Sequence, residues 1–234
     1  VECWGNKHIG TDKPIWDGKQ LLGEHILFNC EAGVGDQILF IRFVKEIIKK
    51  GGKPIVCCSK ELAKLFSNMP ECPAIISNGN IKSIYHDYWV PSMATPVILK
   101  TSYEDLDGEP YLKPSKKNIK KFEGIMKSKK FKIGIRLYGN PEFENEQFRI
   151  FPQELMFDAV NFKNFKVFSL QDKYEEEIPN GIINMSPFLN TWEDTAGIIE
   201  NLDLVITSCT GLAHLSAAMG KPTWIVVPVL PYWG

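Results

Sequence analysis

Short apolar runs alternate with amphipathic stretches along most of this chain, the pattern typical of parallel α/β proteins. The clearest unit spans residues 203–221. It opens with an apolar run and continues through small polar residues at 207–211. Leu212, Leu215 and Met219 then recur at helical spacing, and glycine and proline follow as stop signals. This unit is therefore predicted to be a buried strand, a tight turn and a helix.

The same alternation runs through both halves of the chain. In the first half it predicts strands at 25–30, 54–58 and 74–77, helices at 37–50 and 60–67, and further strands or loops at 85–90 and 97–99. In the second half it predicts strands at 132–137, 166–170, 182–185, 204–206 and 222–227, and helices at 116–130, 152–160 and 191–201.

Residues 101–118 interrupt this pattern. They show no clear period and contain one glycine and two prolines. Such a stretch is typical of a domain boundary. We therefore predict α/β architecture with two Rossmann-like, doubly wound domains, 1–112 and 113–234, facing each other across a cleft.

Composition narrows the possible classes of protein. The chain has 234 residues, of which 44% are hydrophobic and 24% charged, as in soluble globular proteins. The net charge of −1 argues against a general nucleic-acid or membrane-surface binder, and the lysines of 113–121 suggest a solvated helix. No apolar run reaches membrane-spanning length. The six cysteines lack C-x-x-C spacing, so we expect reduced thiols and a cytoplasmic protein rather than a zinc site.

The turn at 207–211 is a candidate anion site. A helix start directs free backbone N–H groups out of the sheet, and these groups favour anions. The ring of His214, one turn into the helix, leans back toward that start. An ordinary strand–helix unit remains the alternative.

A second candidate is the turn containing Gly33 and Gly35, which follows the first strand. It lacks the third glycine of a dinucleotide fingerprint, because position 38 is Ile, and no acidic residue closes the next strand. We therefore expect no nicotinamide or flavin cofactor. Asp36 follows this turn, either as a helix cap or as a general base.

Arg149 closes a polar loop that holds three glutamates. It could form a local salt bridge, or it could clamp a phosphate with two parallel hydrogen bonds. The chain contains no P-loop, H-E-x-x-H, G-x-S-x-G or EF-hand motif.

These motifs, taken together, resemble those of a known protein family. The runs EAGVGDQILFIRF and SCTGLAHLSAAMGKP, the loop GNPEFENEQFRIFP and the Trp16-Asp17-Gly18 lead-in resemble the ADP-heptosyltransferase group of GT-B glycosyltransferases. The sequence looks closest to the family 9-like domains found behind tetratricopeptide repeats in bacterial proteins, over most of 14–233. The resemblance implies an acceptor-side N-terminal domain and a C-terminal domain that binds a nucleotide sugar. It also leads us to expect that the C-terminal domain lacks its closing helices.

The resemblance implies roles for particular residues. Asp36 matches the proposed catalytic base, and Arg149 matches a basic residue that contacts donor phosphate. Thr210, Gly211 and His214 match the turn that binds the donor diphosphate. We expect further donor contacts from Asn140, Gln171 and Ser208, and a loop shaped by Gly33 and Gly35, with no metal ion and no cofactor.

The expected function is transfer of a sugar from a nucleotide-diphosphate sugar to a hydroxyl of a glycan, lipid-linked or protein acceptor, without nucleic-acid partners. Heptosyltransferases usually carry Asp where this chain has Cys209, so we expect a donor other than ADP-heptose. The alternative is a non-catalytic nucleotide-sugar-binding or scaffold domain of a repeat protein. A sugar-nucleotide epimerase of similar shape has no motif of its own here.

Overall fold

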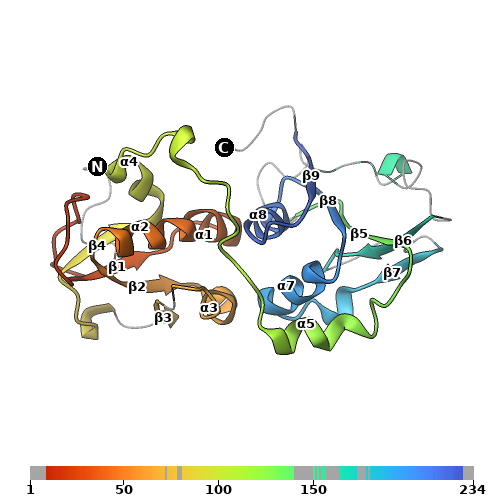
Figure 1. The fold of residues 1–234 in the computed structure, drawn as a ribbon, viewed down its shortest axis with the longest axis horizontal. Coiled ribbons are helices and arrows are strands. Elements are labelled where there is room, and N and C mark those ends of the chain that lie inside the picture. Colours follow the sequence, from red (N-terminus) through yellow and green to blue (C-terminus); the bar gives the residue numbers. More distant parts are fainter. Residues whose placement is uncertain are drawn as a thin grey trace. The chain divides into compact units, whose positions relative to one another are not determined.

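The computed structural model describes residues 9–71, 73–77, 81–139, 150, 152, 154–156, 164–172, 178 and 180–228. The chain divides into two compact units, Val1–Tyr111 and Leu112–Gly234. Each unit contains one parallel sheet with helices around it (Figure 1). The predicted α/β class with two doubly wound sheets is confirmed.

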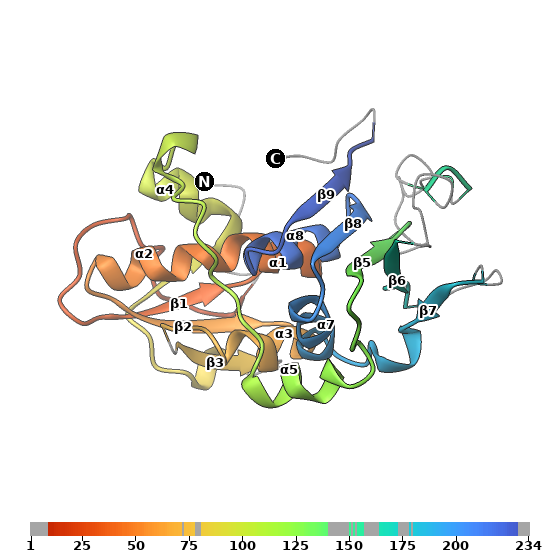
Figure 2. The same ribbon diagram turned by 45° about the vertical axis from the view of Figure 1, so that its right-hand side comes forward.

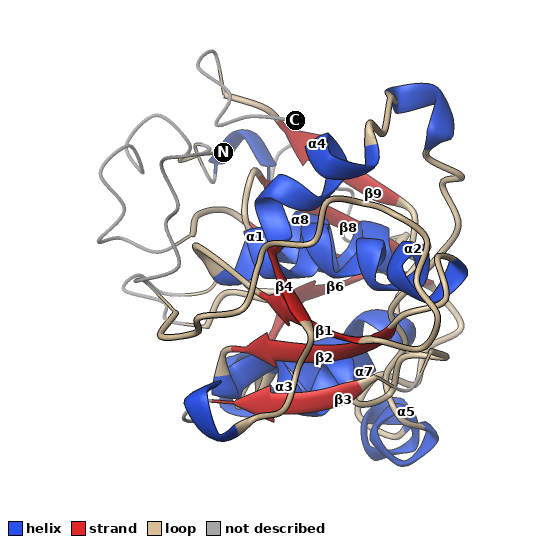
Figure 3. Cartoon of the chain, turned by 90° about the vertical axis from the view of Figure 1, so that its left-hand side faces the viewer, coloured by secondary structure: helices blue, strands red, loops and turns tan. Residues whose placement is uncertain are grey.

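The sheet of unit 1 has four parallel strands in the order β3-β2-β1-β4, which Figure 3 shows side by side. Its central strand β1 is apolar and wholly buried at Ile26, Leu27 and Phe28, as expected where helices cover both faces. The strands are β1 His25–Asn29, β2 Lys53–Cys58, β3 Ala74–Ser77 and β4 Tyr88–Pro91. The helices are α1 Val34–Phe40, η1 Ile41–Phe43, α2 Val44–Lys49, α3 Lys60–Phe66, η2 Ile81–Ser83, η3 Ser92–Ala94, α4 Thr95–Leu99 and η4 Tyr103–Asp105.

The helix after β1 starts earlier than the pattern predicts. Its first residue is Val34 rather than Gln37, and the 3₁₀ turn η1 links α1 to α2. Glycine has a low helix propensity, so the sequence around Gly35 reads as a turn. Gly51 follows the C-cap Lys50 of α2; it has a φ of 84°, and a Cβ there would collide with the Leu21 carbonyl.

Residues 97–99, expected to be a strand or a loop, lie instead in the short helix α4. Three apolar residues are too few to show a period. Pro96 stands in the first turn of α4, where its missing N–H group costs no helical hydrogen bond. The nearby strand β4 also begins three residues later than expected, at Tyr88.

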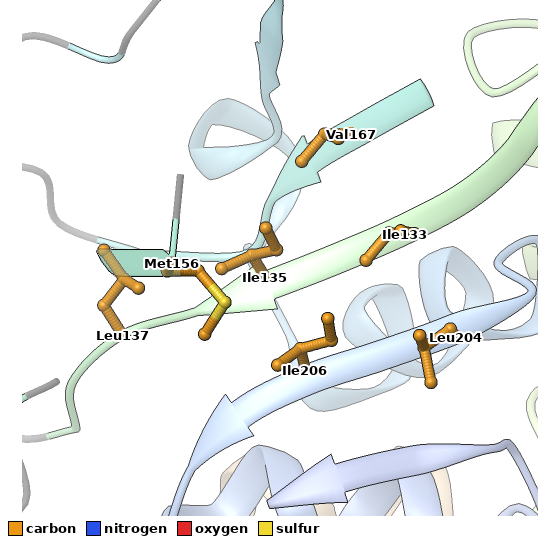
Figure 4. Packing of buried hydrophobic residues seen from close by; sticks show 7 residues of the cluster. All are labelled: Ile133, Ile135, Leu137, Met156, Val167, Leu204 and Ile206. Atoms are coloured by element: carbon orange, nitrogen blue, oxygen red, sulfur yellow. The ribbon is translucent and has the colours of Figure 1, made fainter. Parts of the chain in front are cut away.

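The sheet of unit 2 has five parallel strands in the order β7-β6-β5-β8-β9. One face holds the apolar cluster shown in Figure 4, to which β5, β6 and β8 contribute. Helix α5 lies alongside α7, as Figures 1 and 2 both show. The strands are β5 Phe131–Arg136, β6 Phe165–Ser169, β7 Ile182–Asn184, β8 Leu204–Ser208 and β9 Thr223–Val226, and the helices are α5 Lys116–Glu123, η6 Ser186–Phe188, α7 Trp192–Glu200 and α8 Gly211–Ala218.

Strand β9 forms where predicted, but it is not a buried strand. Trp224 is 65% exposed and Ile225 is 43% exposed. The reason is that β9 lies at the edge of the sheet and pairs with β8 alone among the strands the structure describes.

The two sheets have the same strand connectivity around their first strand, and this connectivity determines where the candidate sites lie. The first strand of each unit lies between its second and fourth strands, so β1 adjoins β4 and β5 adjoins β8. The strand order reverses at these pairs. In open α/β sheets, ligands bind outside the carboxyl ends of the strands at such switch points.

None of the helices that the structure describes is long and apolar enough to cross a membrane.

Candidate functional site

In unit 1, hydrogen bonds tie the carboxyl ends of β1 and β4 together at their switch point. The backbone N–H of Glu31 donates to Ser92 Oγ at 3.2 Å, and Glu31 Oε2 accepts from the Met93 N–H at 3.2 Å. Partial burial raises the pKa of the Glu31 carboxyl above its usual value, and the hydrogen bond from Met93 opposes that rise. Glu31 is therefore an acidic group held in place beside the glycine turn.

The turn that contains Gly33 is fixed by hydrogen bonds of the Gln37 side chain. Ala32 has a φ of 56°, a left-handed conformation that is uncommon for a residue other than glycine. The buried side chain of Gln37 donates to the Ala32 carbonyl at 3.4 Å and accepts from the Ser59 N–H at 3.0 Å, which links the loops after β1 and β2. These bonds fix the backbone that carries Gly33 and Asp36.

Asp36 lies in the first turn of α1, where Gly33 is the N-cap residue. Asp36 Oδ2 accepts from the Gly33 N–H at 2.9 Å, so the carboxylate caps the helix. A Cβ at Gly33 would lie 3.2 Å from that same oxygen, a close contact that would require the carboxylate to shift. Asp36 and Gly35 are both half-buried. The cap is thus observed, and the role of Asp36 as a base stays a prediction.

In unit 2, three hydroxyl side chains gather where β8 meets α8. Thr207 Oγ1 donates to the Ser208 carbonyl at 3.0 Å and lies 3.3 Å from Thr210 Oγ1. Thr210 is the N-cap residue of α8, yet its side chain forms no capping hydrogen bond. Ser208 Oγ is buried and has no hydrogen-bond partner in the part of the chain that the structure describes. The start of α8 is therefore not capped by its own side chain.

Gly211 and His214 complete this helix start. Gly211 is the first residue of α8, and His214 lies one turn further on, half-buried. The structure thus brings four predicted residues to one place, Ser208, Thr210, Gly211 and His214.

Gln171, predicted to contact the donor, is 1% exposed at the carboxyl end of β6. Its side-chain oxygen accepts from the N–H groups of Leu137 and Tyr138 at 3.3 and 3.4 Å, and its nitrogen donates to the Tyr138 carbonyl at 3.2 Å. These bonds hold the chain that leaves β5. Donor contact by Gln171 stays a prediction.

The sequence interpretation missed Arg136, the last residue of β5. Its side chain is 12% exposed, and its guanidinium donates to the Tyr138 carbonyl at 3.0 Å and pairs with Asp172 at 3.0 Å. Arg136 is the register partner of Thr207 on β8, so a cation stands at this switch point. The available signal was an arginine that directly follows the apolar run Ile133-Gly134-Ile135.

Two predicted donor contacts, Asn140 and Arg149, lie outside the described residues. Among the described residues, no group of three histidine, cysteine, aspartate or glutamate side chains is arranged to hold a metal ion.

No protein-family model and no curated protein matches the sequence. Among solved structures, the chain resembles the E. coli ADP-heptose lps heptosyltransferase II at 13% identity, over 86% of this chain and 84% of that one, with a TM-score of 0.61. It resembles the glycosyl transferase family 9 protein from Veillonella parvula DSM 2008 at 11% identity, over 89% and 82%, with a TM-score of 0.67. It resembles E. coli heptosyltransferase WaaC with ADP-2-deoxy-2-fluoro heptose at 11% identity, over 90% of each chain, with a TM-score of 0.56. The fold is therefore that of the GT-B heptosyltransferases.

Proposed function

We propose that this chain is a glycosyltransferase that moves a sugar from a nucleotide-diphosphate sugar to an acceptor hydroxyl on a glycan, lipid-linked molecule or protein. The observation that carries the proposal is the start of α8, which lies at a switch point of its sheet and whose N-cap residue, Thr210, forms no side-chain capping bond. The fold match to heptosyltransferases supports it.

The start of α8 suits a diphosphate for electrostatic reasons. A helix N-terminus carries a partial positive charge and unpaired N–H donors, which favour phosphate oxygens. The hydroxyls of Ser208 and Thr210 add donors, and His214 adds a third group one turn away. These groups would stabilise the diphosphate as it leaves the sugar, with Arg149 as a further phosphate contact and with no metal ion required.

Asp36 would act as the general base that takes the proton from the acceptor hydroxyl. One of its oxygens caps Gly33, and a carboxylate has enough lone pairs to accept a second hydrogen bond. Glu31 is the second candidate, since burial moves its pKa toward neutral pH, where a base is most effective.

A binding or scaffold domain without turnover, in a repeat protein, is the second candidate function. The half-buried Cys209 favours it, because a neutral residue stands next to Thr210 where heptosyltransferases usually carry a carboxylate. Such a replacement would leave diphosphate binding intact, since it removes only a negative charge near the anion.

The test is a thermal-shift screen with ADP-, GDP-, UDP- and CMP-linked sugars, followed by mass spectrometry of each stabilising donor incubated with the protein and candidate acceptors. Sugar transfer that persists in EDTA would support the metal-independent transferase. Stabilisation without any release of nucleoside diphosphate would support the binding domain. No stabilisation by any donor would contradict both.

A further inference from the structure

The segment 113–130 is strongly basic, although the chain as a whole is nearly neutral. It contains eight lysines and a single acidic residue, Glu123, for a net charge of +7. Because the whole chain carries −1, the remaining residues carry −8. All eight lysines are exposed, and we call them the lysine surface: Lys113, Lys116, Lys117, Lys120, Lys121, Lys127, Lys129 and Lys130.

The fold holds these lysines outward. Helix α5 buries Phe122 and, just after the helix, Met126 is buried as well. The helix start is fixed by Glu193, whose carboxylate accepts from the Ser115 N–H at 2.8 Å. Since the apolar side packs inward next to α7, the lysine side faces solvent on a fixed backbone.

Few of these charges are neutralised by neighbours. Lys121 pairs with Asp194 at 2.6 Å, and in the described parts of the chain no other lysine of the set forms an ion pair. The same segment and the strand that follows it also expose apolar side chains. Ile125 is 43% exposed and Phe131 is 48% exposed. The surface is therefore cationic and partly apolar.

We propose that the lysine surface docks the protein on an anionic lipid bilayer. Helix α5 itself carries four of the eight lysines, and the other four flank it. Clusters of about four to eight basic residues on an amphipathic helix bind anionic headgroups, and exposed apolar side chains can enter the interface. The set contains lysine and no arginine, which favours a diffuse negative surface over the bidentate phosphate recognition common with nucleic acids. The excess negative charge elsewhere would orient the protein with α5 toward the bilayer. The net charge of −1 for the whole chain does not show that positive charge is concentrated at 113–130 and negative charge elsewhere.

The chain offers a closely matched pair of variants. Helices α5 and α3 each follow a serine N-cap and carry lysines at their first and fifth positions. Lys116→Glu with Lys120→Glu reverses two charges on the lysine surface. Lys60→Glu with Lys64→Glu makes the same change at the same helix positions in unit 1.

The experiment is co-sedimentation of the full chain with phosphatidylcholine vesicles, with and without phosphatidylserine, over a range of salt. Circular dichroism checks that each variant is folded. We expect binding only with phosphatidylserine, loss of binding as salt rises, and a partition coefficient roughly tenfold lower or more in the α5 variant, with the α3 control unchanged. Equal losses in both variants, or equal binding to both kinds of vesicle, would overturn the proposal. Tighter binding to a poly-uridine RNA than to the vesicles, abolished by the α5 variant, would reassign the surface to nucleic acid.

Discussion

The carboxylate of Asp36 accepts a hydrogen bond from the backbone N–H of Gly33, with 2.9 Å between Oδ2 and the nitrogen. The bond closes the first turn of α1 at a switch point of the unit 1 sheet. The same side chain is thus a structural cap and a candidate catalytic base. Substitutions can separate the two roles, because an amide keeps the acceptor oxygen and loses the basicity.

Asp36→Asn should preserve stability and abolish most turnover. The amide oxygen can still accept from Gly33, so the melting temperature should stay near that of the parent. The transfer rate should fall by about 10²–10⁴-fold if Asp36 is the general base. Asp36→Ala should also lose about 1 kcal/mol of unfolding free energy, because the cap is removed.

Donor affinity, measured by calorimetry, is the control for both Asp36 variants and should match the parent. Transfer by Asp36→Asn at the parent rate would leave Asp36 as a cap only. In that case Glu31→Gln is the next variant to assay.

Glu31 should make stability depend on pH. Burial raises its folded-state pKa above the usual 4.5, so the folded state binds its proton more tightly than the unfolded state does. The resulting stabilisation is full below pH 4.5 and is lost as the pH rises through the folded-state pKa. Relative to Glu31→Gln, the parent should therefore become less stable as the pH rises through this window.

Urea unfolding of the parent and Glu31→Gln at a series of pH values measures this difference. Glu61→Gln, which changes an exposed glutamate on α3, is the control. A parent-minus-variant difference that does not vary with pH for Glu31→Gln would refute the assignment.

Gln171→Ala should destabilise the protein. The substitution removes the side-chain acceptor of the Leu137 N–H, a buried donor. Each buried group left unpaired costs about 1–3 kcal/mol. Chemical denaturation measures the loss, and Gln20→Ala, at an exposed residue, is the control. A loss no larger than in the control would mean that these bonds do not hold the loop.

Cys58 should react slowly with thiol reagents in the native state. Burial, with a smaller contribution from Cys57, raises the pKa of Cys58 to about 12. Thiolate is the reactive form, so little of it exists at pH 8 or below. Alkylation by iodoacetamide, located by peptide mass spectrometry, should modify Cys58 readily only after denaturant is added. Rapid native modification at Cys58 would contradict this environment.

The sequence predicts local units better than it predicts contacts between them. The helix predicted at 191–201 begins with a local cap, since the Thr191 hydroxyl accepts from the Asp194 N–H at 3.0 Å. This cap depends on residues three positions apart, which a linear pattern records. The strand alternation likewise predicts both parallel sheets.

What the sequence missed depends on distant partners. Gln37 bonds to Ser59, 22 positions away, and Arg136 bonds to Asp172, 36 positions away. No periodic signal marks such pairs. The exposure of β9 also depends on its place at the sheet edge, which the composition of the strand does not reveal.

The most direct test of the proposed function is calorimetric titration of ADP, GDP and UDP into three proteins: the parent, Thr210→Val and Ser216→Ala. Thr210 Oγ1 forms no cap bond, so its loss should cost the helix little. Ser216 is the control, because its buried hydroxyl donates to the Leu212 and Ala213 carbonyls and accepts from Thr223 Oγ1. We predict that the parent and Ser216→Ala bind one nucleoside diphosphate equally, and that Thr210→Val binds it more weakly by about 1.5–3 kcal/mol. No binding of any nucleoside diphosphate, or parent affinity in Thr210→Val, would contradict a donor site at the start of α8.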